Sequence, residues 1–243
     1  MIERHHFQSI PSTQDLAKTR QDQLRGETWR LITADEQTQG RATHNKNWQS
    51  PPHVNLYATF SLLIPPAKNA VLFNVPQVTA YSIIKALQQF GFTPKFKWVN
   101  DILINRKKIC GILCESFGKV LHIGMGINVN MPQAICEQLD QPVTSLMVVS
   151  GREIDKEQLL TIIQAELYKN INQLFTESFA PFHTELDEFL EYKNEEIMFD
   201  PMSANTTVVK GLLLGIDQKG QLILKLPNDE IKIFYNGRLV RPQ

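Results

Sequence analysis

The stretch Lys97-Trp98-Val99-Asn100-Asp101, followed by Gly111-Ile112-Leu113-Cys114-Glu115, is the most informative part of this sequence. Both stretches set polar or charged residues among apolar residues that a folded chain would largely bury. A buried cation or carboxylate is costly unless it finds a partner. Two partners are available to Lys97, namely Asp101 and a charged ligand, since a lysine held beside a pocket can bind carboxylates and phosphates. We therefore expect an anion-binding site here.

Helical and strand patterns alternate along the chain, which indicates a mixed α and β fold. Apolar residues at helical spacing predict helices over 75–90, 155–174 and 182–190. The segment 35–47 carries no large apolar residue, so we expect a mobile loop there. The expected strands, of which the third and fourth form a hairpin, lie at 29–34, 55–64, 95–104, 108–115 and 120–129.

The sequence changes character near residue 200. Beyond this point, short apolar segments alternate with turns that contain Gly and Asn, which is typical of a small β-barrel. We therefore expect a larger domain over 1–199 and a small barrel domain over 200–243. The expected strands of the barrel are 206–209, 211–216, 221–226, 230–234 and 238–240.

Composition argues against several classes of partner. The 25 Lys and Arg residues balance 25 Asp and Glu residues, so no overall basic field favours nucleic acid. No unbroken apolar run approaches the roughly 18–20 residues needed to cross a bilayer. The first six residues lack the apolar core of a signal peptide. We therefore expect a cytoplasmic protein with neither a nucleic-acid nor a membrane partner.

Four blocks occur in order: Ser12-Thr13-Gln14, the segment 37–51, the hairpin 97–115, and the segment 124–130 with sequence Gly-Met-Gly-Ile-Asn-Val-Asn. Together they resemble the biotin–protein ligases, which attach biotin to a lysine of a biotin carboxyl carrier protein, a subunit of acetyl-CoA carboxylase. The hairpin block is the most specific of the four. The resemblance is close over 7–131 and loose over the C-terminal strands.

The resemblance implies a fold and a two-step reaction. The family's catalytic domain is α+β, a mixed sheet flanked by helices like that of class II aminoacyl-tRNA synthetases, and an SH3-like β-barrel follows it. Biotin and ATP, with Mg²⁺, form biotinyl-5′-AMP and pyrophosphate. A lysine of the carrier protein then takes the biotinyl group and releases AMP. Only eleven residues precede Ser12, too few for the DNA-binding domain of some family members, so we expect an enzyme only.

The resemblance also implies catalytic residues. Lys97 matches the family's essential lysine, which neutralises charge where the carboxylate meets the α-phosphate. Asp101 matches an acid near the reacting centre, which either orients Lys97 or helps to deprotonate the incoming lysine. Arg41 matches the first arginine of the family's ligand-binding loop, where a guanidinium can bond two oxygens at once. The structural alternatives are an ion pair between Lys97 and Asp101, and a solvated Arg41.

Two sets of ligand-binding residues follow from the same match. In each set some residues have a purely structural alternative: a helix N-cap for Ser12, core packing for Trp48, and turn hydrogen bonds for the two asparagines of the fourth block. No metal ligand is identified. The implied biotin site consists of Ser12, Thr13, Gln14, Gln37, Arg41, Lys97 and Gly111. The implied ATP site consists of Arg41, Ala42, Thr43, Trp48, Lys97, Asn100, Asn128 and Asn130.

Two other functions compete with the biotin–protein ligase. A lipoate or octanoate ligase shares the fold and a lysine, but the hairpin block argues against it. A non-catalytic sensor of biotin or nucleotide belongs to a different class, and the joint presence of Lys97, Asp101 and Arg41 argues for chemistry. A sheet edge could also support a homodimer or dock the carrier by strand pairing.

The ligand-binding loop departs from the family pattern. The family commonly has Gly-Arg-Gly-Arg-Arg-Gly-Arg, whereas this chain has Gly-Arg-Ala-Thr-His-Asn-Lys over 40–46, with His44 and Lys46 as remaining cations. Fewer charge-assisted hydrogen bonds would hold the adenylate, so we expect biotinyl-AMP to escape faster than from members with the full loop. Release can be timed with labelled intermediate. Slow release, together with no effect of Thr43→Arg, would contradict this expectation.

Overall fold

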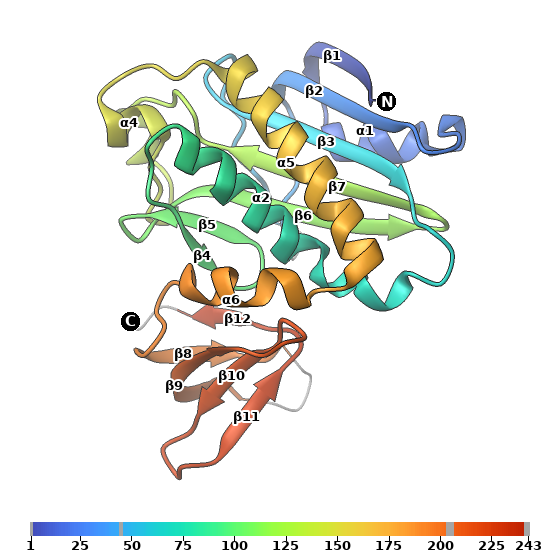
Figure 1. The fold of residues 1–243 in the computed structure, drawn as a ribbon. Coiled ribbons are helices and arrows are strands. Elements are labelled where there is room, and N and C mark those ends of the chain that lie inside the picture. The colour runs from blue at the N-terminus through green and yellow to red at the C-terminus, as the bar shows by residue number, and fades with distance from the viewer. Residues whose placement is uncertain (1, 44–45, 203–206, 241–243) are drawn as a thin grey trace.

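The computed structural model describes residues 2–43, 46–202 and 207–240. They form a seven-stranded mixed sheet flanked by helices, with a smaller five-stranded sheet at the C-terminal end (Figure 1). This confirms the expected α+β architecture. The expected cation His44 and the start of the strand 206–209 lie outside the described residues.

The large sheet has the order β1-β2-β3-β7-β6-β5-β4. Only β1 and β2 pair in parallel; the other neighbouring strands are antiparallel. β1 was not expected from the sequence, and β2 continues to Gln37, through the first residues of the expected loop. The strands are β1 Ile2–Ile10, β2 Trp29–Gln37, β3 Leu56–Leu63, β4 Lys95–Lys97, β5 Asp101–Ile104, β6 Lys107–Phe117 and β7 Val120–Ile127.

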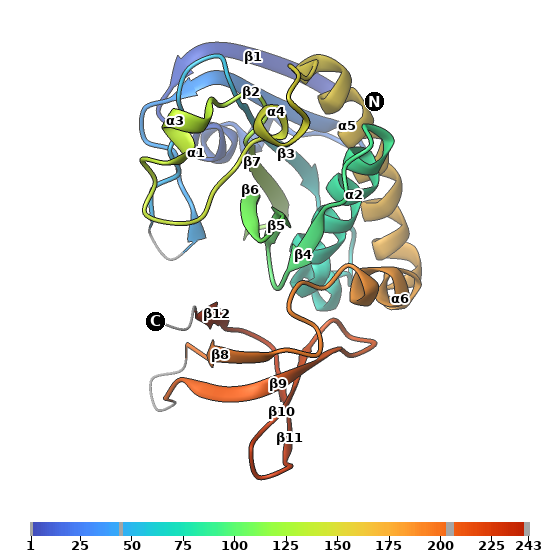
Figure 2. The same ribbon diagram turned by 90° about the vertical axis from the view of Figure 1, so that its left-hand side faces the viewer.

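Helices cover the two faces of this sheet unequally. Figure 2 shows α2 and α5 on one side and the short α1 on the other. α6 leads into the C-terminal sheet (Figure 1). The helices are α1 Thr13–Thr19, α2 Val75–Gln89, α3 Gln133–Cys136, α4 Leu146–Ser150, α5 Lys156–Glu177 and α6 Ala180–Glu188, with 3-10 turns η1 Gln21–Gln23 and η3 Asn69–Asn74.

The segment Asn69–Gln89, formed by η3 and α2, is long and apolar enough by composition to cross a membrane. Most of it is buried inside the protein, as expected of a core helix. The segment holds no long unbroken apolar run, because polar residues interrupt the pattern. Two of these, Gln77 and Thr79, are themselves fully buried.

The decisive stretch at 95–104 is two strands rather than the single expected one. β4 ends at Lys97 and β5 begins at Asp101, and the chain turns through the three residues between them. Lys97 and Asp101 are therefore direct cross-strand partners. The turn carries the buried Trp98 into the core, which explains why an aromatic residue stands between polar ones.

The C-terminal sheet has the order β11-β10-β9-β8-β12, so β11 and β12 are its outer strands. It begins at Glu196, before the boundary at 200 that the sequence suggested, because β8 pairs with both β9 and β12. Its strands are β8 Glu196–Asp200, β9 Val209–Ile216, β10 Leu222–Lys225, β11 Ile231–Phe234 and β12 Arg238–Val240.

Trp98 joins the two sheets. Its Nε1 donates to the carbonyl oxygen of Gly220 at 3.0 Å, and its ring lies 5.9 Å from that of Phe199 on β8. The Gly220 carbonyl also accepts from Gln77 Nε2 of α2 at 2.8 Å. The C-terminal sheet is thus attached through buried polar and aromatic contacts.

We expect Trp98→Ala to lower the free energy of unfolding by about 3–5 kcal/mol, since it removes a large buried side chain and a hydrogen-bond donor. Urea denaturation measures this change. The matched control is Phe117→Ala, because Phe117 is 64% exposed and its loss should change stability by less than about 0.5 kcal/mol. Equal effects of the two substitutions would contradict the assignment.

Candidate functional site

One face of the central strands is built from small and polar residues. Along β7, Leu121, Ile123, Met125 and Ile127 belong to the apolar core, so His122, Gly124 and Gly126 face the opposite side. The pairing with β3 and β6 extends this face in three rows. The rows are Tyr57–Gly126–Gly111, Thr59–Gly124–Leu113 and Ser61–His122–Glu115.

A cleft lies on this face. Beside it, Ser12 is the N-cap of α1, and its side chain accepts from the backbone N–H of Asp15. The cleft contains most of the expected ligand-binding residues, together with several that the sequence did not indicate. Its lining residues are Ser12, Thr13, Gln14, Gln37, Arg41, Ala42, Thr43, Trp48, Thr59, Asn100, Lys108, Gly111, Ile112, Leu113, Gly124, Met125 and Gly126.

Hydrogen bonds order one wall of the cleft. Gln37 Oε1 accepts from Thr13 N at 2.9 Å and from Thr13 Oγ1 at 3.0 Å, while Gln37 Nε2 donates to Ser50 Oγ. Thr59 Oγ1 lies 2.9 Å from Thr13 Oγ1 and 3.2 Å from Gln14 Oε1. These buried amides and hydroxyls are the groups needed to recognise a polar uncharged ligand.

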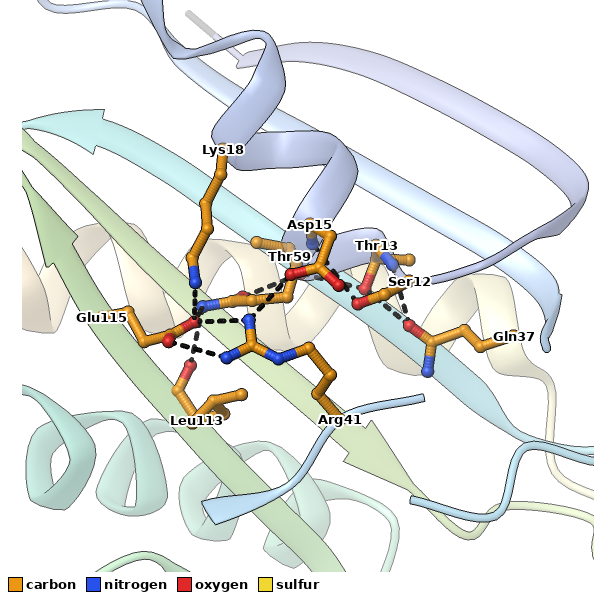
Figure 3. A network of polar contacts seen from close by, with 10 residues as sticks. Ser12, Thr13, Asp15, Lys18, Gln37, Arg41, Thr59, Leu113 and Glu115 are labelled. Atoms are coloured by element: carbon orange, nitrogen blue, oxygen red, sulfur yellow. Dashed lines mark hydrogen bonds and ion pairs between the residues drawn. The ribbon is translucent and has the colours of Figure 1, made fainter. Parts of the chain in front are cut away.

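Glu115 is the centre of an ionic network beside this wall (Figure 3). Its carboxylate accepts from Arg41 at 3.0 and 3.1 Å and from Gln14 Nε2 at 2.9 Å, and it pairs with Lys18 at 2.7 Å. Arg41 also bonds Asp15 at 2.8 Å. The loop that carries Arg41 is therefore tied to α1 and β6, and its guanidinium is not the solvated charge of the structural alternative.

The network holds Glu115 in its ionised form. Burial alone would raise the pKa of this carboxyl, but hydrogen bonds from Lys18, Gln14 and Arg41 outweigh burial and lower the pKa to about 2. A carboxylate that is ionised at neutral pH can only accept hydrogen bonds. Glu115 therefore determines which way the Gln14 amide faces, with a weaker contribution from the Leu113 carbonyl, 3.4 Å from Gln14 Nε2.

Trp48 lies on a platform of two glycines. A Cβ placed on Gly126 would be 2.5 Å from Nε1 of the indole, and one on Gly111 would be 2.7 Å from Cζ3. Gly111 and Gly126 are cross-strand partners, so together they form a flat surface. The Nε1 of Trp48 is buried and has no hydrogen-bond partner among the described residues.

Lys108 reaches the cleft because the β5–β6 ladder is irregular. Asp101 pairs with Gly111 and Leu103 pairs with Lys108, so the register shifts by one residue at Ile109. This shift is a β-bulge. Strict alternation would turn the Lys108 side chain away from the face that carries Gly111, and the extra residue in the bulge turns it back to that face. Lys108 Nζ then lies 2.6 Å from Asp101 Oδ1 and 5.3 Å from the centre of the Trp48 ring.

Lys97 does not line the cleft in this structure. It lies on the edge strand β4, opposite Asp101, and borders a different hollow with Arg106, Tyr192 and residues of the C-terminal sheet. Asp101 pairs with Lys108, whereas the sequence suggested Lys97 as its partner. The cation beside Gly111 is Lys108, whose Nζ would be 3.2 Å from a Cβ on that glycine.

The remaining predicted residues divide into two groups. Ala42, Thr43 and Asn100 line the cleft, and Asn100 also donates to the carbonyl of Ile112 at 2.8 Å. Asn128 and Asn130 are buried away from it. Their amides brace nearby segments. Asn128 Nδ2 donates to Thr144 O, Asn55 Nδ2 donates to Asn128 Oδ1, and Asn130 bonds both the N–H and the C=O of Ile154.

Comparison with known proteins places this site in a family. A model of the biotin/lipoate A/B protein ligase family matches residues 6–130. The chain belongs to this family. The match covers the cleft-forming strands β2, β3, β6 and β7, the loop that carries Arg41, and Lys108. It ends before α5 and the C-terminal sheet, so the shared part of the family is the part that builds the cleft.

Individual relatives from bacteria extend the likeness. The bifunctional ligase/repressor BirA of Bacillus subtilis is 30% identical over 217 residues, and the match covers 85% of this chain but 64% of that protein. The chain thus spans less than two thirds of the length of that relative. A biotin–[acetyl-CoA-carboxylase] ligase of Paracoccus denitrificans is 29% identical, with 84% of this chain and 86% of that protein covered.

A solved structure shares the whole fold. The biotin protein ligase of Aquifex aeolicus in complex with biotin and ATP superposes with a TM-score of 0.83 at 26% identity, covering 98% of this chain and 97% of that one. The likeness includes the C-terminal sheet. The expected fold class, a ligase-type catalytic domain followed by a small β-domain, is thereby confirmed.

The ionised state of Glu115 gives a pH prediction. Its pKa is lower in the folded protein than its ordinary value of 4.5, so the carboxylate stabilises the fold above pH 4.5, and this stabilisation is lost as the pH falls toward about 2. We expect Glu115→Gln to lower the free energy of unfolding by on the order of 2 kcal/mol at neutral pH, and by progressively less below pH 4.5.

Urea denaturation of both proteins across this pH range measures the difference. Burial lowers the pKa of the neighbouring His122 to about 4, and this histidine is present in both proteins. The charge of Glu115 raises that pKa as the smallest of three contributions, so His122 changes the comparison little. A difference that stays constant from neutral pH to pH 3 would contradict the role given to Glu115.

Proposed function

We propose that this protein is a biotin–protein ligase that activates biotin with ATP and transfers it to a lysine of a biotin carboxyl carrier protein. The observation that carries the proposal is that one cleft contains both a polar wall and a lysine. A wall of amides and hydroxyls lines the same cleft as Lys108, a lysine that is paired with Asp101. The Paracoccus relative is a biotin–[acetyl-CoA-carboxylase] ligase, which supports the acetyl-CoA carboxylase subunit as the acceptor.

The wall suits the ureido ring of biotin. Thr13, Gln14, Gln37 and Thr59 combine hydroxyl and amide groups within one hydrogen-bonded set, and the ureido group both donates and accepts. The indole of Trp48 covers the Gly111–Gly126 platform and gives the same cleft a flat aromatic surface. Biotin bound with its ring at the wall would extend its carboxylate toward Lys108.

Lys108 supplies the positive charge that the first step requires. A biotin carboxylate oxygen attacks the α-phosphorus of ATP, and the bond to pyrophosphate breaks, so two anions must approach each other. An ammonium group held in place lowers this barrier because it needs no reorganisation. Asp101, 2.6 Å from Lys108 Nζ, positions the ammonium. In the second step the carrier lysine attacks the biotinyl carbonyl, and AMP leaves.

The nucleotide would lie against the loop residues Ala42, Thr43 and Trp48 and beside Asn100, all of which line the cleft. The indole of Trp48 offers a flat surface to the adenine. Mg²⁺ would enter with the phosphates of ATP, because the described residues contain no group of three His, Cys, Asp or Glu side chains able to hold a metal ion. Asn128 and Asn130 take no part in this site.

The proposal extends to partners and location. Balanced charge supports the absence of a nucleic-acid partner. β1 is an outer strand of the large sheet and offers its open edge to a second copy or to the carrier. A cytoplasmic location would supply ATP and the carboxylase subunit together. We propose no membrane partner, since the apolar segment 69–89 is committed to the core.

Incubation with biotin, Mg-ATP and a carrier domain tests the activity. We expect the mass of the carrier to increase by one biotinyl group. Lipoate in place of biotin is the control for the related ligase activity and should give no mass increase. Binding of biotin without pyrophosphate exchange or labelling would favour a sensor and contradict the proposal.

Paired substitutions separate the two candidate lysines. We expect Lys108→Ala to lower the labelling rate at least about 100-fold, because it removes the cation inside the cleft. Lys97→Ala, whose parent residue lies on the edge strand outside the cleft, should lower it less than about tenfold. Unfolding curves confirm that both variants fold. If Lys97→Ala is the more damaging change, the role belongs to Lys97 as the sequence match suggested.

A further inference from the structure

The hydrogen bonds of the cleft wall have a fixed direction at both ends. At one end, the backbone N–H of Thr13 donates to Gln37, so the Gln37 oxygen faces Thr13 and its nitrogen faces Ser50. At the other end, the carboxylate of Glu115 accepts from Gln14 Nε2, so the Gln14 oxygen faces the wall. Neither amide can turn over without losing these bonds.

Between these ends the wall has one hydrogen-bond donor fewer than it has acceptors to satisfy. The hydroxyl proton of Thr13 goes to Gln37 Oε1, which also takes the backbone N–H. Thr59 has one hydroxyl proton but two acceptors within reach, Thr13 Oγ1 at 2.9 Å and Gln14 Oε1 at 3.2 Å. Among the described residues, one of these two acceptors is therefore left without a donor. Both residues line the cleft.

We propose that Glu115 is a positioning residue that makes this wall select ligands with an N–H donor. Glu115 does not itself line the cleft; it acts through Gln14, whose orientation it sets. The inference rests on the proposed function, since the ureido ring of biotin carries two N–H groups. The donor that the wall lacks is then supplied by the ligand.

Replacing the carboxylate by an apolar side chain would release this constraint. Gln14, Lys18 and one Arg41 nitrogen all bond the same carboxylate oxygen, Oε2, and Glu115→Met removes this acceptor, while Arg41 keeps its bond with Asp15. Only the longer contact of Gln14 Nε2 with the Leu113 carbonyl, at 3.4 Å, would then oppose a turn of the Gln14 amide that presents its own N–H groups to the wall. The missing donor would be supplied by the protein, and the preference for a donating ligand would fall.

The test compares the binding of biotin with that of its two cyclic carbamate analogues, in which one or the other ring N–H is replaced by oxygen. Titration calorimetry gives the ratio of dissociation constants for each pair. We expect the unchanged protein to bind at least one analogue ten- to a hundredfold more weakly than biotin, because an acceptor then faces an acceptor. In Glu115→Met this ratio should fall to within about threefold.

Two further variants make the result specific. Gln14→Met removes the amide but leaves Glu115 its bonds with Arg41 and Lys18, so the same loss of discrimination is expected even where Glu115→Met does not fold. Lys18→Met is the matched control. It removes one cation from the same carboxylate but keeps the bond from Glu115 to Gln14, so the ratio should stay as in the unchanged protein.

Retention of the original ratio by Glu115→Met or Gln14→Met, or its loss in Lys18→Met, would overturn the inference. Equal binding of biotin and both analogues by the unchanged protein would overturn it as well, while leaving the proposed function intact. Failure of the unchanged protein to bind biotin would contradict the proposed function and the inference together. The ratio of dissociation constants separates the two effects, because a loss of protein stability alone weakens the binding of all three ligands by the same factor.

Discussion

The site depends on the in-register antiparallel pairing of β3, β7 and β6. Because side chains alternate along a strand, this pairing turns one face of the three strands toward α2 and α5 and leaves the other for polar residues and glycines. A shift of one residue would exchange the two faces. The row Thr59–Gly124–Leu113 and the glycine platform beside it exist only in this register.

Glu115 couples this sheet to the segments that cover it. Its carboxylate receives hydrogen bonds from α1, through Gln14 and Lys18, and from the loop, through Arg41 (Figure 3). The ordering of the loop, the orientation of the recognising amide and the ionisation of Glu115 are consequently parts of one network. A group of this kind influences ligand choice without touching the ligand, because an ionised carboxylate can only accept and so sets the direction of each hydrogen bond that it receives.

Most of the architecture was predictable from the sequence, because the core helices α2 and α5 and the strands β3 and β7 carry strong periodic patterns. The position of Lys108 was not, since its direction depends on a register shift that periodicity does not reveal. The sequence favours Lys97 because this residue belongs to the most recognisable motif, yet that motif is a turn between the edge strand β4 and its neighbour β5. Likewise, Asn128 and Asn130 follow a strand that lines the cleft, but local hydrogen bonds turn their amides inward.

A crystal structure of the complex with biotin is the most direct test of this account. The account predicts that the ureido ring lies against the wall formed by Thr13, Gln14 and Thr59, with an N–H donating to Gln14 Oε1 or Thr13 Oγ1, and that the carboxylate points toward Lys108 Nζ. A complex in which the carboxylate instead meets Lys97, or in which the ring lies away from the Thr59–Gly124–Leu113 row, would contradict it.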